Sequence, residues 1–529
     1  MIGWSSFQPA GQEQTYLLDA LASGWVSGGP YVAKLEEQVQ AHFGGRALAV
    51  SNGTAALFLA YQTLGLRSGD RVLVPGFCFQ AAANALMQLG AVPVFYDVDP
   101  LTWNATAATV KTALQAYHDP DHPICGIVVV HNYGYGGDIA AIADLAKAQG
   151  IWLIEDAAEA WFSAQDGAYL GTFGDVSTFS MHATKTIACG EGGIVLINRP
   201  DLVGTAELYR SHGLNREAIQ YMHLLPGNNY RLSNLLAAVA CAQLEARESI
   251  LAQQAARTQA FRAALADMPE CRFQASIVGA DDRAWADAVF LDTTQLAVDR
   301  DRLMQIIKER GVDLRPGFYT PKSLTYYSNP EATPVSDRIA AQTIVLPCAL
   351  SMTPEDWETV TSVVREVITQ ARVPELAAVL HQVTADAPGA LLALIPALNS
   401  HSDGFRYFES RDVSVLQDHL TTVVLMINDQ PVGYGHLDQE GPVTWLGIAI
   451  LPSYSGKGFG HKIMQALMQS AADQGLEQVD LFVDRTNDGA QHLYLRHGFH
   501  EQSEQSNSAA VRMICRPAAV QSLTISPLS

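Results

Sequence analysis

Short apolar runs alternate with helix-length segments along the first part of the chain. The runs that read as buried strands are RVLVPGF (71–77), AVPVFYDVD (91–99), GIVVVHNYG (126–134) and IWLIEDAAEA (151–160). Between them, AALFLAYQTLG, NALMQLG and IADLAKAQG have the apolar spacing of helices. Because nearly continuous apolar strands joined by helices bury both faces of a sheet, this part is predicted to be an α/β fold with a mostly parallel central sheet.

The pattern changes after the helical segment DWETVTSVVREVITQAR. The second part offers two long strand-like stretches, TTVVLMINDQPVGYGHLD and GPVTWLGIAILP, then a glycine-rich turn, the helix HKIMQALMQSAADQG, the strand QVDLFVD and a last helix. We therefore divide the chain into a first domain over 1–373, a linker and helical connection over 374–404, a second α/β domain over 405–517 and an unstructured tail over 518–529.

Size and charge narrow the classes of function. A chain of 529 residues with 48% apolar residues can build more than one packed core. The net charge of -21, without a basic run, argues against nucleic-acid binding. The seven cysteines are scattered and lack a C-x-x-C pair, which favours reduced thiols over disulfides or a metal site. No stretch of 18 apolar residues and no signal-like start is found, so we expect a cytoplasmic protein without a membrane segment.

One lysine stands in an unusual setting. Lys185 lies in FSMHATKTIACGEGG, among small and polar residues, where a shaped and partly dry pocket can present its amine to a carbonyl. Asp156 ends the strand IWLIED at the edge where open α/β folds bind ligands, and such a carboxylate can keep a ring nitrogen protonated. The alternative for Asp156 is a helix cap or a surface position.

Further candidates accompany Lys185 and Asp156. In SNGTAALF, Gly53 and Thr54 open a helix whose amides can hold a phosphate, although N-G-T also makes a plain turn. Ser180 can add a hydroxyl to that phosphate, and Phe79 can cover a flat ring; routine packing is the alternative for both.

A family resemblance joins these residues. It rests on GWVSGGPYVAKLEE, SNGTAALFLA, RVLVPGFCFQAAANALMQLGAVPVFYDVD, EDAAEA, GTFGDVSTFSMHATK, GEGG and NNYRLSNLLAAVACAQLE, which follow one another over roughly the first 370 residues. This order resembles the DegT-type sugar aminotransferases, which are fold-type I pyridoxal phosphate enzymes with a small C-terminal subdomain. The resemblance implies that Lys185 forms the Schiff base with the cofactor. Sugar dehydratases of this family carry histidine there instead.

The resemblance also assigns the other positions. Asp156 pairs with the pyridine nitrogen, Phe79 stacks on the ring, and Gly53, Thr54 and Ser180 hold the phosphate. Asn229 matches an asparagine that reaches the phosphate site of the neighbouring subunit, which implies a homodimer with shared active sites. Glu159, near the cofactor hydroxyl, departs from the usual Gln or His and is expected to alter rate or substrate preference.

The same family resemblance suggests the substrates. It implies L-glutamate as the amino donor, with Lys185 moving the proton as general base and acid. LRPGFYTP (314–321) resembles a stretch of members that make 4-amino-4,6-dideoxy sugars on a nucleotide carrier. Arg315 is therefore a candidate for a diphosphate contact, with a loop anchor as the alternative. The usual P-L-H continuation is missing at Lys322 and Ser323.

The second domain has a signature of its own. LGIAILPSYSGKGFGHKIMQALM and RTNDGAQHLYLRHGF together resemble the GNAT acetyltransferases over about 405–517. The resemblance implies that coenzyme A is bound by Ile450, Gly456, Gly458, Gly460 and Asn487. Tyr494 would protonate the leaving thiolate. Ser455 replaces the usual Arg or Gln, which is expected to weaken coenzyme A binding, and His436 and Glu440 are candidates for a general base, with structural roles as the alternative.

Together the two halves predict a bifunctional enzyme. Amination of a nucleotide-linked keto-6-deoxysugar, followed by acetylation with acetyl-CoA, would make an N-acetylated amino sugar for a surface glycan such as O-antigen or capsule. The alternative is an aminotransferase with a degenerate coenzyme A binding module that regulates or scaffolds. Ser455 favours that alternative, whereas Tyr494, Asn487 and the glycines favour acetyl transfer.

Overall fold

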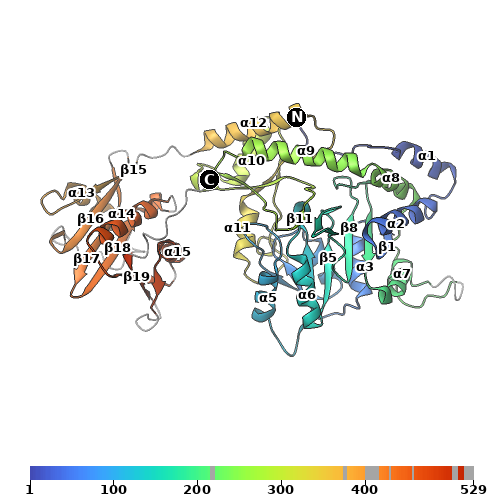
Figure 1. Cartoon of the computed structure of the whole chain (residues 1–529), viewed down its shortest axis with the longest axis horizontal. Coiled ribbons are helices and arrows are strands. Elements are labelled where there is room, and N and C mark those ends of the chain that lie inside the picture. Colours follow the sequence, from blue (N-terminus) through green and yellow to red (C-terminus); the bar gives the residue numbers. More distant parts are fainter. Residues whose placement is uncertain are drawn as a thin grey trace. The chain divides into compact units, whose positions relative to one another are not determined.

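The computed structural model describes residues 1–214, 221–372, 378–399, 416–427, 430–455, 458–485, 487–502 and 510–517. The chain forms two compact units, Met1–Arg372 and Val373–Ser529 (Figure 1). Both combine helices with a seven-stranded sheet, which confirms the predicted α/β class. In the described part of the chain, no helix combines the length and apolar character that a bilayer span requires.

The first unit begins with two helices that precede the central sheet. Its helices are α1 (Glu13–Ala22), α2 (Pro30–Phe43), α3 (Gly53–Thr63), α4 (Ala81–Gln88), α5 (Ala107–Ala116), α6 (Ile139–Gln149), α7 (Val203–Arg210), α8 (Asn234–Glu245), α9 (Arg247–Leu265), α10 (Arg300–Glu309), α11 (Pro334–Gln342) and α12 (Pro354–Ala371). Its central strands are β1 (Arg46–Val50), β2 (Arg71–Pro75), β3 (Val92–Tyr96), β4 (Ile124–Val130), β5 (Trp152–Asp156), β8 (Val176–Ser180) and β9 (Gly193–Ile197).

The central sheet has the order β1-β9-β8-β5-β4-β2-β3. β9 runs antiparallel to both of its neighbours, while β8, β5, β4, β2 and β3 pair in parallel. Six strands therefore share one direction, as the alternating pattern predicted. Figure 1 shows β1, β8 and β5 near one another in this sheet. Their carboxyl ends meet at one edge, which is where open α/β sheets bind ligands.

Helices cover both faces of this sheet. Apolar residues of α2, α5, α6 and α8, such as Leu35, Val110 and Ile142, form one buried cluster with the inward side chains of the strands. Residues of α3, α4 and α7, such as Leu57 and Leu86, form a second cluster against the other face. Within β2, Leu73 belongs to the first cluster and its neighbours to the second, because successive strand side chains point to opposite faces.

The C-terminal part of the first unit is a smaller layer. Its antiparallel sheet, of order β10-β12-β14-β13, is made by β10 (Cys271–Phe273), β12 (Ala288–Leu291), β13 (Arg315–Pro316) and β14 (Thr343–Val345). Apolar residues of α9, α10 and α12 pack with it in one core. A third sheet joins β6 (Ala164–Gln165), β7 (Ala168–Tyr169) and β11 (Ala280–Asp281). This layer matches the expected small subdomain.

The second unit contains one sheet of order β15-β16-β17-β18-β19-β21-β20. The elements are β15 (Ala378–Gln382), α13 (Gly389–Asn399), β16 (His419–Ile427), β17 (Gln430–Glu440), β18 (Val443–Ile450), α14 (Phe459–Asp473), β19 (Val479–Asp484), α15 (Asp488–Arg496), β20 (His500–Glu501) and β21 (Ala510–Cys515). β18 and β19 are parallel, and the other strand pairs are antiparallel.

The described part of 374–404, for which the sequence predicted a linker and helical connection, contains one strand and one helix. β15 pairs with β16 from Ala378↔Ile427 to Gln382↔Val423, and Leu391 and Leu394 of α13 lie in a core cluster with Tyr434. Both elements therefore belong to the second unit. β15 is an exposed edge strand whose residues do not alternate between buried and exposed, so its sequence lacks the usual pattern of a strand. The predicted tail over 518–529 lies outside the described residues.

Candidate active site

Three of the predicted cofactor residues end or follow strands of the central sheet. Asp156 is the last residue of β5 and Ser180 the last of β8, and these strands pair with Asp156 opposite Thr178. Gly53 begins α3 directly after β1 and the turn that follows it. The sheet topology thus brings residues that are far apart in sequence to one edge.

Lys185 lies in this region and makes an ion pair with a buried carboxylate. Its Nζ is 2.9 Å from Oε1 of Glu159, and the other Glu159 oxygen accepts a hydrogen bond from the backbone N–H of Tyr133. The Lys185 ammonium also lies 3.5 Å from the centroid of the Trp285 ring. The amine is therefore held between a carboxylate and an aromatic face, and not in open solvent.

Trp285 and Tyr133 were missed by the sequence reasoning. Trp285 comes from a loop of the small subdomain, 100 positions beyond Lys185, and its indole N–H donates to the carbonyl of Thr184. Tyr133 follows β4 and has a φ of 59°, a left-handed conformation that is uncommon for a non-glycine residue. Neither role has a local pattern that could have revealed it.

Asp156 is buried and has an unusual proton affinity. Its Oδ1 accepts hydrogen bonds from the backbone N–H of Ala158 at 3.1 Å and from the Thr178 hydroxyl at 3.3 Å. Burial raises the pKa of Asp156 to about 6, against the lowering effect of the Ala158 N–H; Glu159 raises it further and Lys185 lowers it. A buried carboxylate of this kind is stabilised when a cation is placed beside it.

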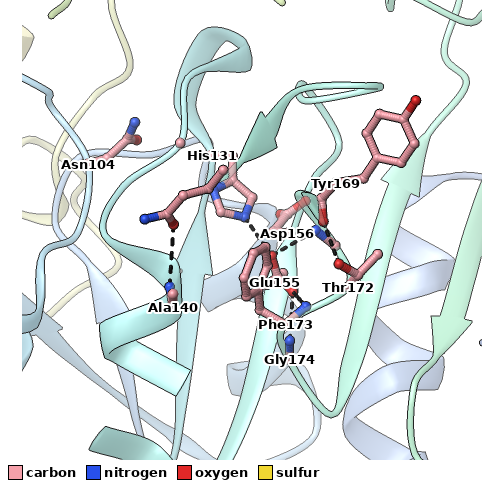
Figure 2. A network of polar contacts seen from close by, with 12 residues as sticks. Asn104, His131, Ala140, Glu155, Asp156, Tyr169, Thr172, Phe173 and Gly174 are labelled. Carbon is pink, nitrogen blue, oxygen red and sulfur yellow. Dashed lines mark hydrogen bonds and ion pairs between the residues drawn. The ribbon is translucent and has the colours of Figure 1, made fainter. Parts of the chain in front are cut away.

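A buried network supports the strand that carries Asp156. Glu155 accepts hydrogen bonds from the backbone N–H groups of Gly171, Phe173 and Gly174, each at 2.7 Å. Its Oε2 also lies 3.0 Å from Nε2 of His131 (Figure 2). Both side chains are fully buried. Glu155 was also missed, although a charged residue inside an apolar strand is a sequence signal that it needs buried partners.

The proposed phosphate residues are close together. A Cβ built on Gly53 would lie 3.0 Å from Cβ and 3.3 Å from Oγ of Ser180, and one on Gly193 would lie 2.6 Å from the carbonyl oxygen of Asn52. Because both positions are glycine, the backbone at Gly53 can approach Ser180 and the backbone at Gly193 can approach Asn52. Asn52 caps α3 by accepting from Ala55 N, while Thr54 is exposed at the first turn. The helix start and the Ser180 hydroxyl thus share one small region.

Arg315 is connected to Lys185 through two tryptophans. Its guanidinium lies 5.8 Å from the Trp4 ring centroid, and Trp4 packs edge-on against Trp285 at 5.9 Å. Arg315 also forms an ion pair with Asp313 at 3.1 Å and is half exposed. The ion pair with Asp313 supports the loop-anchoring alternative, and the exposed part of the guanidinium stays accessible to an anion.

Phe79 and Asn229 stand apart from this cluster. Phe79 follows β2, is 64% exposed, and contacts Phe318 with a centroid distance of 6.1 Å. Asn229 is exposed, and its Oδ1 accepts from Nε of Arg231 at 2.9 Å. In the described part of the chain, no hydrogen bond, ion pair or ring contact links Phe79 or Asn229 to Lys185.

A cavity lies directly beside Lys185. The N-terminal segment Ser5–Gln8 forms one wall, opposite the turn that carries the lysine. The cavity is lined by Ser5, Ser6, Phe7, Gln8, Ala183, Thr184, Lys185, Ala188, Gln243, Gln254, Cys348 and Leu350. The lysine therefore borders a space enclosed by segments from both ends of the first unit.

In the second unit, the loop between β18 and α14 ends at a tight helix start. Gly458 is the N-cap of α14 with a φ of 78°, and a Cβ on Gly460 would lie 2.9 Å from Leu493 of α15 and 3.8 Å from Ile450. β18, α14 and α15 therefore converge where the coenzyme residues were expected. Gly456 lies outside the described residues.

Tyr494 and Asn487 both belong to the α15 region. Tyr494 is 8% exposed within the apolar core, and burial raises the pKa of its hydroxyl to about 12. It therefore keeps its proton at neutral pH, as a proton donor must. Asn487 caps α15, because its Oδ1 accepts from Ala490 N at 3.0 Å. Glu440 is exposed at the end of β17, whereas His436 is buried in the middle.

Comparison with known proteins decides the family. Residues 9–365 match the DegT/DnrJ/EryC1/StrS aminotransferase family, and residues 392–499 match the acetyltransferase (GNAT) family. The chain belongs to the DegT/DnrJ/EryC1/StrS aminotransferases and carries a C-terminal GNAT domain. It is thus a member of a pyridoxal-phosphate-dependent sugar aminotransferase family.

Several relatives and solved structures resemble the larger part of this chain. GDP-perosamine synthase of Vibrio cholerae is 35% identical over 342 residues, which is 64% of this chain and 91% of the relative. The aminotransferase TlmJ of Streptoalloteichus hindustanus has a TM-score of 0.65 at 29% identity, covering 70% of this chain and 99% of TlmJ. DesI, whose structure was determined in the presence of its TDP-sugar product, has a TM-score of 0.64 at 28% identity, covering 70% of this chain and 93% of DesI.

The site residues fit pyridoxal phosphate. Burial raises the pKa of the Asp156 carboxyl to about 6, so its ionised form would be stabilised by a protonated ring nitrogen beside it. Gly53 lies so close to Ser180 that a side chain at position 53 would be crowded. Without that side chain, the backbone N–H groups at the start of α3 can receive a phosphate. Lys185 borders the same edge and supplies an amine.

Proposed function

We propose that the first unit transfers an amino group from L-glutamate to a nucleotide-linked keto-6-deoxysugar and that the second unit acetylates the new amine with acetyl-CoA. The observation that carries the proposal is the pairing of Lys185 Nζ with Glu159 at 2.9 Å, close enough to Asp156 to lower the pKa of that carboxyl. A reactive amine and a buried carboxylate at one sheet edge suit amine transfer to a carbonyl.

Each residue of the first site then has a task. Pyridoxal phosphate supplies the electron sink when it is bound. Asp156 would keep the ring nitrogen protonated, Phe79 would cover the ring, and Gly53, Thr54 and Ser180 would hold the phosphate. Lys185 would hold the cofactor through its amine, and its Nζ would act as the general base and acid that accepts and returns the proton of the donor or sugar carbon. Glu159 orients Nζ between these steps, since it already holds that atom.

The sugar is proposed to be a 4-keto-6-deoxyhexose on a nucleoside diphosphate. The names of the GDP-perosamine synthase relatives support GDP as the carrier, and the TDP-sugar product of DesI makes TDP the alternative carrier. Arg315 is the proposed diphosphate contact, because its half-exposed guanidinium can pair with phosphate oxygens while its other face stays on Trp4.

Acetyl transfer is proposed for the second unit. Ile450, Gly456, Gly458, Gly460 and Asn487 would hold acetyl-CoA, and the protonated Tyr494 would supply the proton to the leaving thiolate. Only the amination creates a sugar amine that can attack a thioester, so acetylation comes second. Covalent linkage of the two units raises the concentration of product near the second site. The product would be a precursor of O-antigen or capsule.

The proposed assembly is a homodimer with shared aminotransferase sites. Asn229 would complete the phosphate site of the neighbouring subunit. An exposed apolar face supports this proposal: Leu17, Leu18 and Leu21 of α1 and the following Trp25 and Val26 are all at least 38% exposed. Exposed apolar side chains at helical spacing, followed directly by two more, suit a permanent protein interface.

A coupled assay tests both activities. Purified protein is incubated with L-glutamate, acetyl-CoA and a panel of GDP- and TDP-linked 4-keto and 3-keto sugars, and the products are identified by mass spectrometry. We expect an amino sugar without acetyl-CoA and an N-acetyl sugar with it. Amination without acetylation, together with tight acetyl-CoA binding, would favour the regulatory-module alternative. Ser455, in place of the usual Arg or Gln, is the sequence feature that supports this alternative. Absence of amination on every sugar would refute the proposed function.

A further inference from the structure

The sheet of the second unit carries a column of parallel aromatic rings. His436 of β17 stacks on His419 of β16 with a centroid distance of 4.3 Å and an interplanar angle of 7°. On its own strand, His436 stacks with Tyr434 at 5.5 Å and 11°. Asp438 lies at one end, with Oδ2 3.8 Å from Nε2 of His436. Two imidazoles and a carboxylate therefore share one small region.

This histidine column lies on the face of the sheet that α14 does not cover. A Cβ on Gly435 would lie 2.4 Å from Ile463 of α14, so residue 435 points toward that helix. Its neighbours on β17, Tyr434 and His436, point to the opposite face because strand side chains alternate. Tyr434 there packs with Leu391 and Leu394 of α13.

A glycine on the next strand makes room for the His436 ring. Gly447 of β18 pairs with His436, and a Cβ at Gly447 would lie 2.2 Å from Cε1 of the imidazole. Any other residue at 447 would displace the ring. The His436 ring therefore lies directly over the backbone of β18, and the residue is 4% exposed.

That part of β18 is also where the sheet opens. Among the described residues, Trp445↔Asp480 is the one registered pair between the parallel strands β18 and β19. Beyond Trp445, the described residues from Gly447 to Ile450 are not paired with residues of β19. An extended acyl-pantetheine chain with amide groups can pair with such an open strand edge. The carbonyl of its thioester would then lie near Gly447 and its covering ring.

We propose that His419, His436 and Asp438 form the site for the acceptor amine and that His436 is its proton acceptor. This inference rests on the proposed acetyl transfer. The imidazole of His436 takes one proton from the sugar ammonium, and the freed amine forms a C–N bond with the thioester carbonyl carbon. The C–S bond breaks, the sulfur leaves with the electron pair, and the Tyr494 hydroxyl protonates it. The nitrogen loses a second proton to solvent, and solvent returns a proton to the Tyr494 oxygen. His436 then releases the proton that it accepted.

The surrounding charges favour this role. Asp438 on β17 stabilises the imidazolium form of His436, and His419 on β16 is held in place by the Thr422 hydroxyl, 2.7 Å from its Nδ1. The sequences of α13 and β18 contain no ionisable side chain. Among the described residues, the titratable groups His419, Tyr434 and Asp438 face His436. A carboxylate in this place also attracts the cationic ammonium of the sugar.

The test uses the full chain with GDP-perosamine as the acceptor and thiol release from acetyl-CoA as the readout. For His436→Asn we expect kcat/KM for the amine to fall ~10²- to 10⁴-fold and the KM for acetyl-CoA to stay unchanged. We also expect the acid limb that histidine gives to the wild-type pH profile near neutral pH to disappear. His381→Asn, at an exposed histidine on β15 of the same sheet, is the matched control and should match wild type. Equal kcat/KM and an unchanged pH profile for His436→Asn would overturn the inference.

A second measurement separates this inference from the acetyl transfer itself. Histidine ring NMR signals of the wild-type chain are followed as GDP-perosamine is added in the presence of coenzyme A. Movement of the His419 and His436 signals supports an amine site even if no thiol is released, whereas unmoved signals overturn it. The three side chains also have ligand atoms within 4.8 Å of one another, as a metal site would. Loss of activity with a chelator and its recovery with Zn²⁺ would therefore contradict proton acceptance by His436.

Discussion

The Lys185 ammonium lies 2.9 Å from Oε1 of Glu159 and 3.5 Å from the centre of the Trp285 ring. Glu159 is fixed in turn by the backbone N–H of Tyr133. One carboxylate thus ties the loop after β8 to the loop after β4. Because the pair is mostly buried, removal of one partner leaves the other with an uncompensated charge or an unpaired N–H.

The first prediction concerns cofactor attachment. Lys185→Ala should give a protein without the yellow absorbance of bound pyridoxal phosphate, and borohydride should not fix the cofactor to the chain. Wild type should carry the reduced label on the peptide that contains Lys185, as peptide mass spectrometry would show. Lys147→Ala, at an exposed lysine of α6, is the control and should behave as wild type. A label on any other lysine would contradict the assignment.

Glu159 should contribute to stability before any cofactor binds. Glu159→Ala is expected to lower the free energy of unfolding of the cofactor-free protein by about 2–4 kcal/mol, since it leaves the buried Lys185 ammonium and the Tyr133 N–H without their acceptor. Glu159→Gln keeps one acceptor oxygen, which can serve one of the two donors, and should cost less. Urea unfolding of both variants measures the difference. Equal losses would contradict this expectation, because they would mean that the oxygen kept by Gln contributes nothing to stability.

The raised pKa of Asp156 predicts a pH dependence of stability. A carboxyl whose pKa is about 6 when folded, and about 3.8 when unfolded, holds more protons in the folded state between these values. Its contribution is therefore fully present below the unfolded pKa and is lost as pH rises through about 6, a change of about 3 kcal/mol. Asp156→Asn should stabilise the cofactor-free protein at pH 7.5 but not at pH 4, as thermal unfolding would show. The same gain at both pH values would disprove the shift.

Tyr494→Phe should slow acetyl transfer and leave amination unchanged. The substitution removes the proposed proton donor while keeping the buried ring, so the expected loss is ~10²- to 10⁴-fold if protonation of the thiolate limits the rate. Thiol release and sugar amination are measured on the same preparation. Tyr454→Phe, on the turn after β18, is a control for loss of a tyrosine hydroxyl elsewhere in the unit. Unaltered thiol release in Tyr494→Phe would mean that another group protonates the sulfur.

A mixing experiment tests whether Asn229 acts across a dimer. Lys185→Ala and Asn229→Ala chains are each expected to be poor aminotransferases. When the two are unfolded and refolded together, half of the dimers are mixed, and each mixed dimer has one intact site, so about a quarter of wild-type activity should return. Refolding each variant alone is the control. No recovery in the mixture would mean that Asn229 serves its own chain or no site.

Local sequence was sufficient for the strands, the helices and several site residues. The apolar runs of β2 to β5 and the helices between them determine a parallel sheet, because only burial on both faces accommodates such strands. Asp156 and Ser180 could be placed at its edge because each directly ends a strand. Gly53 and Gly458 could be placed at helix starts for a similar local reason.

The tertiary structure alone decided which groups meet. Trp285 reaches Lys185 from the small subdomain, and Trp4 connects it to Arg315 from the N-terminal segment. β15 joins the second sheet although its sequence lacks the alternation of a half-buried strand. Such contacts depend on strand order and on which side chains the packing leaves facing each other, and no local pattern encodes either.

The histidine column shows the division most clearly. The sequence offers His436 as one of two candidates for a general base and says nothing of His419, which lies 17 positions earlier. The pairing of β16 with β17 stacks the two rings, and the pairing of β17 with β18 sets His436 over Gly447. Sequence by itself determined that each segment is a strand, since that depends on local periodicity. Register decided the chemistry, because a shift of one residue would turn His436 to the opposite face.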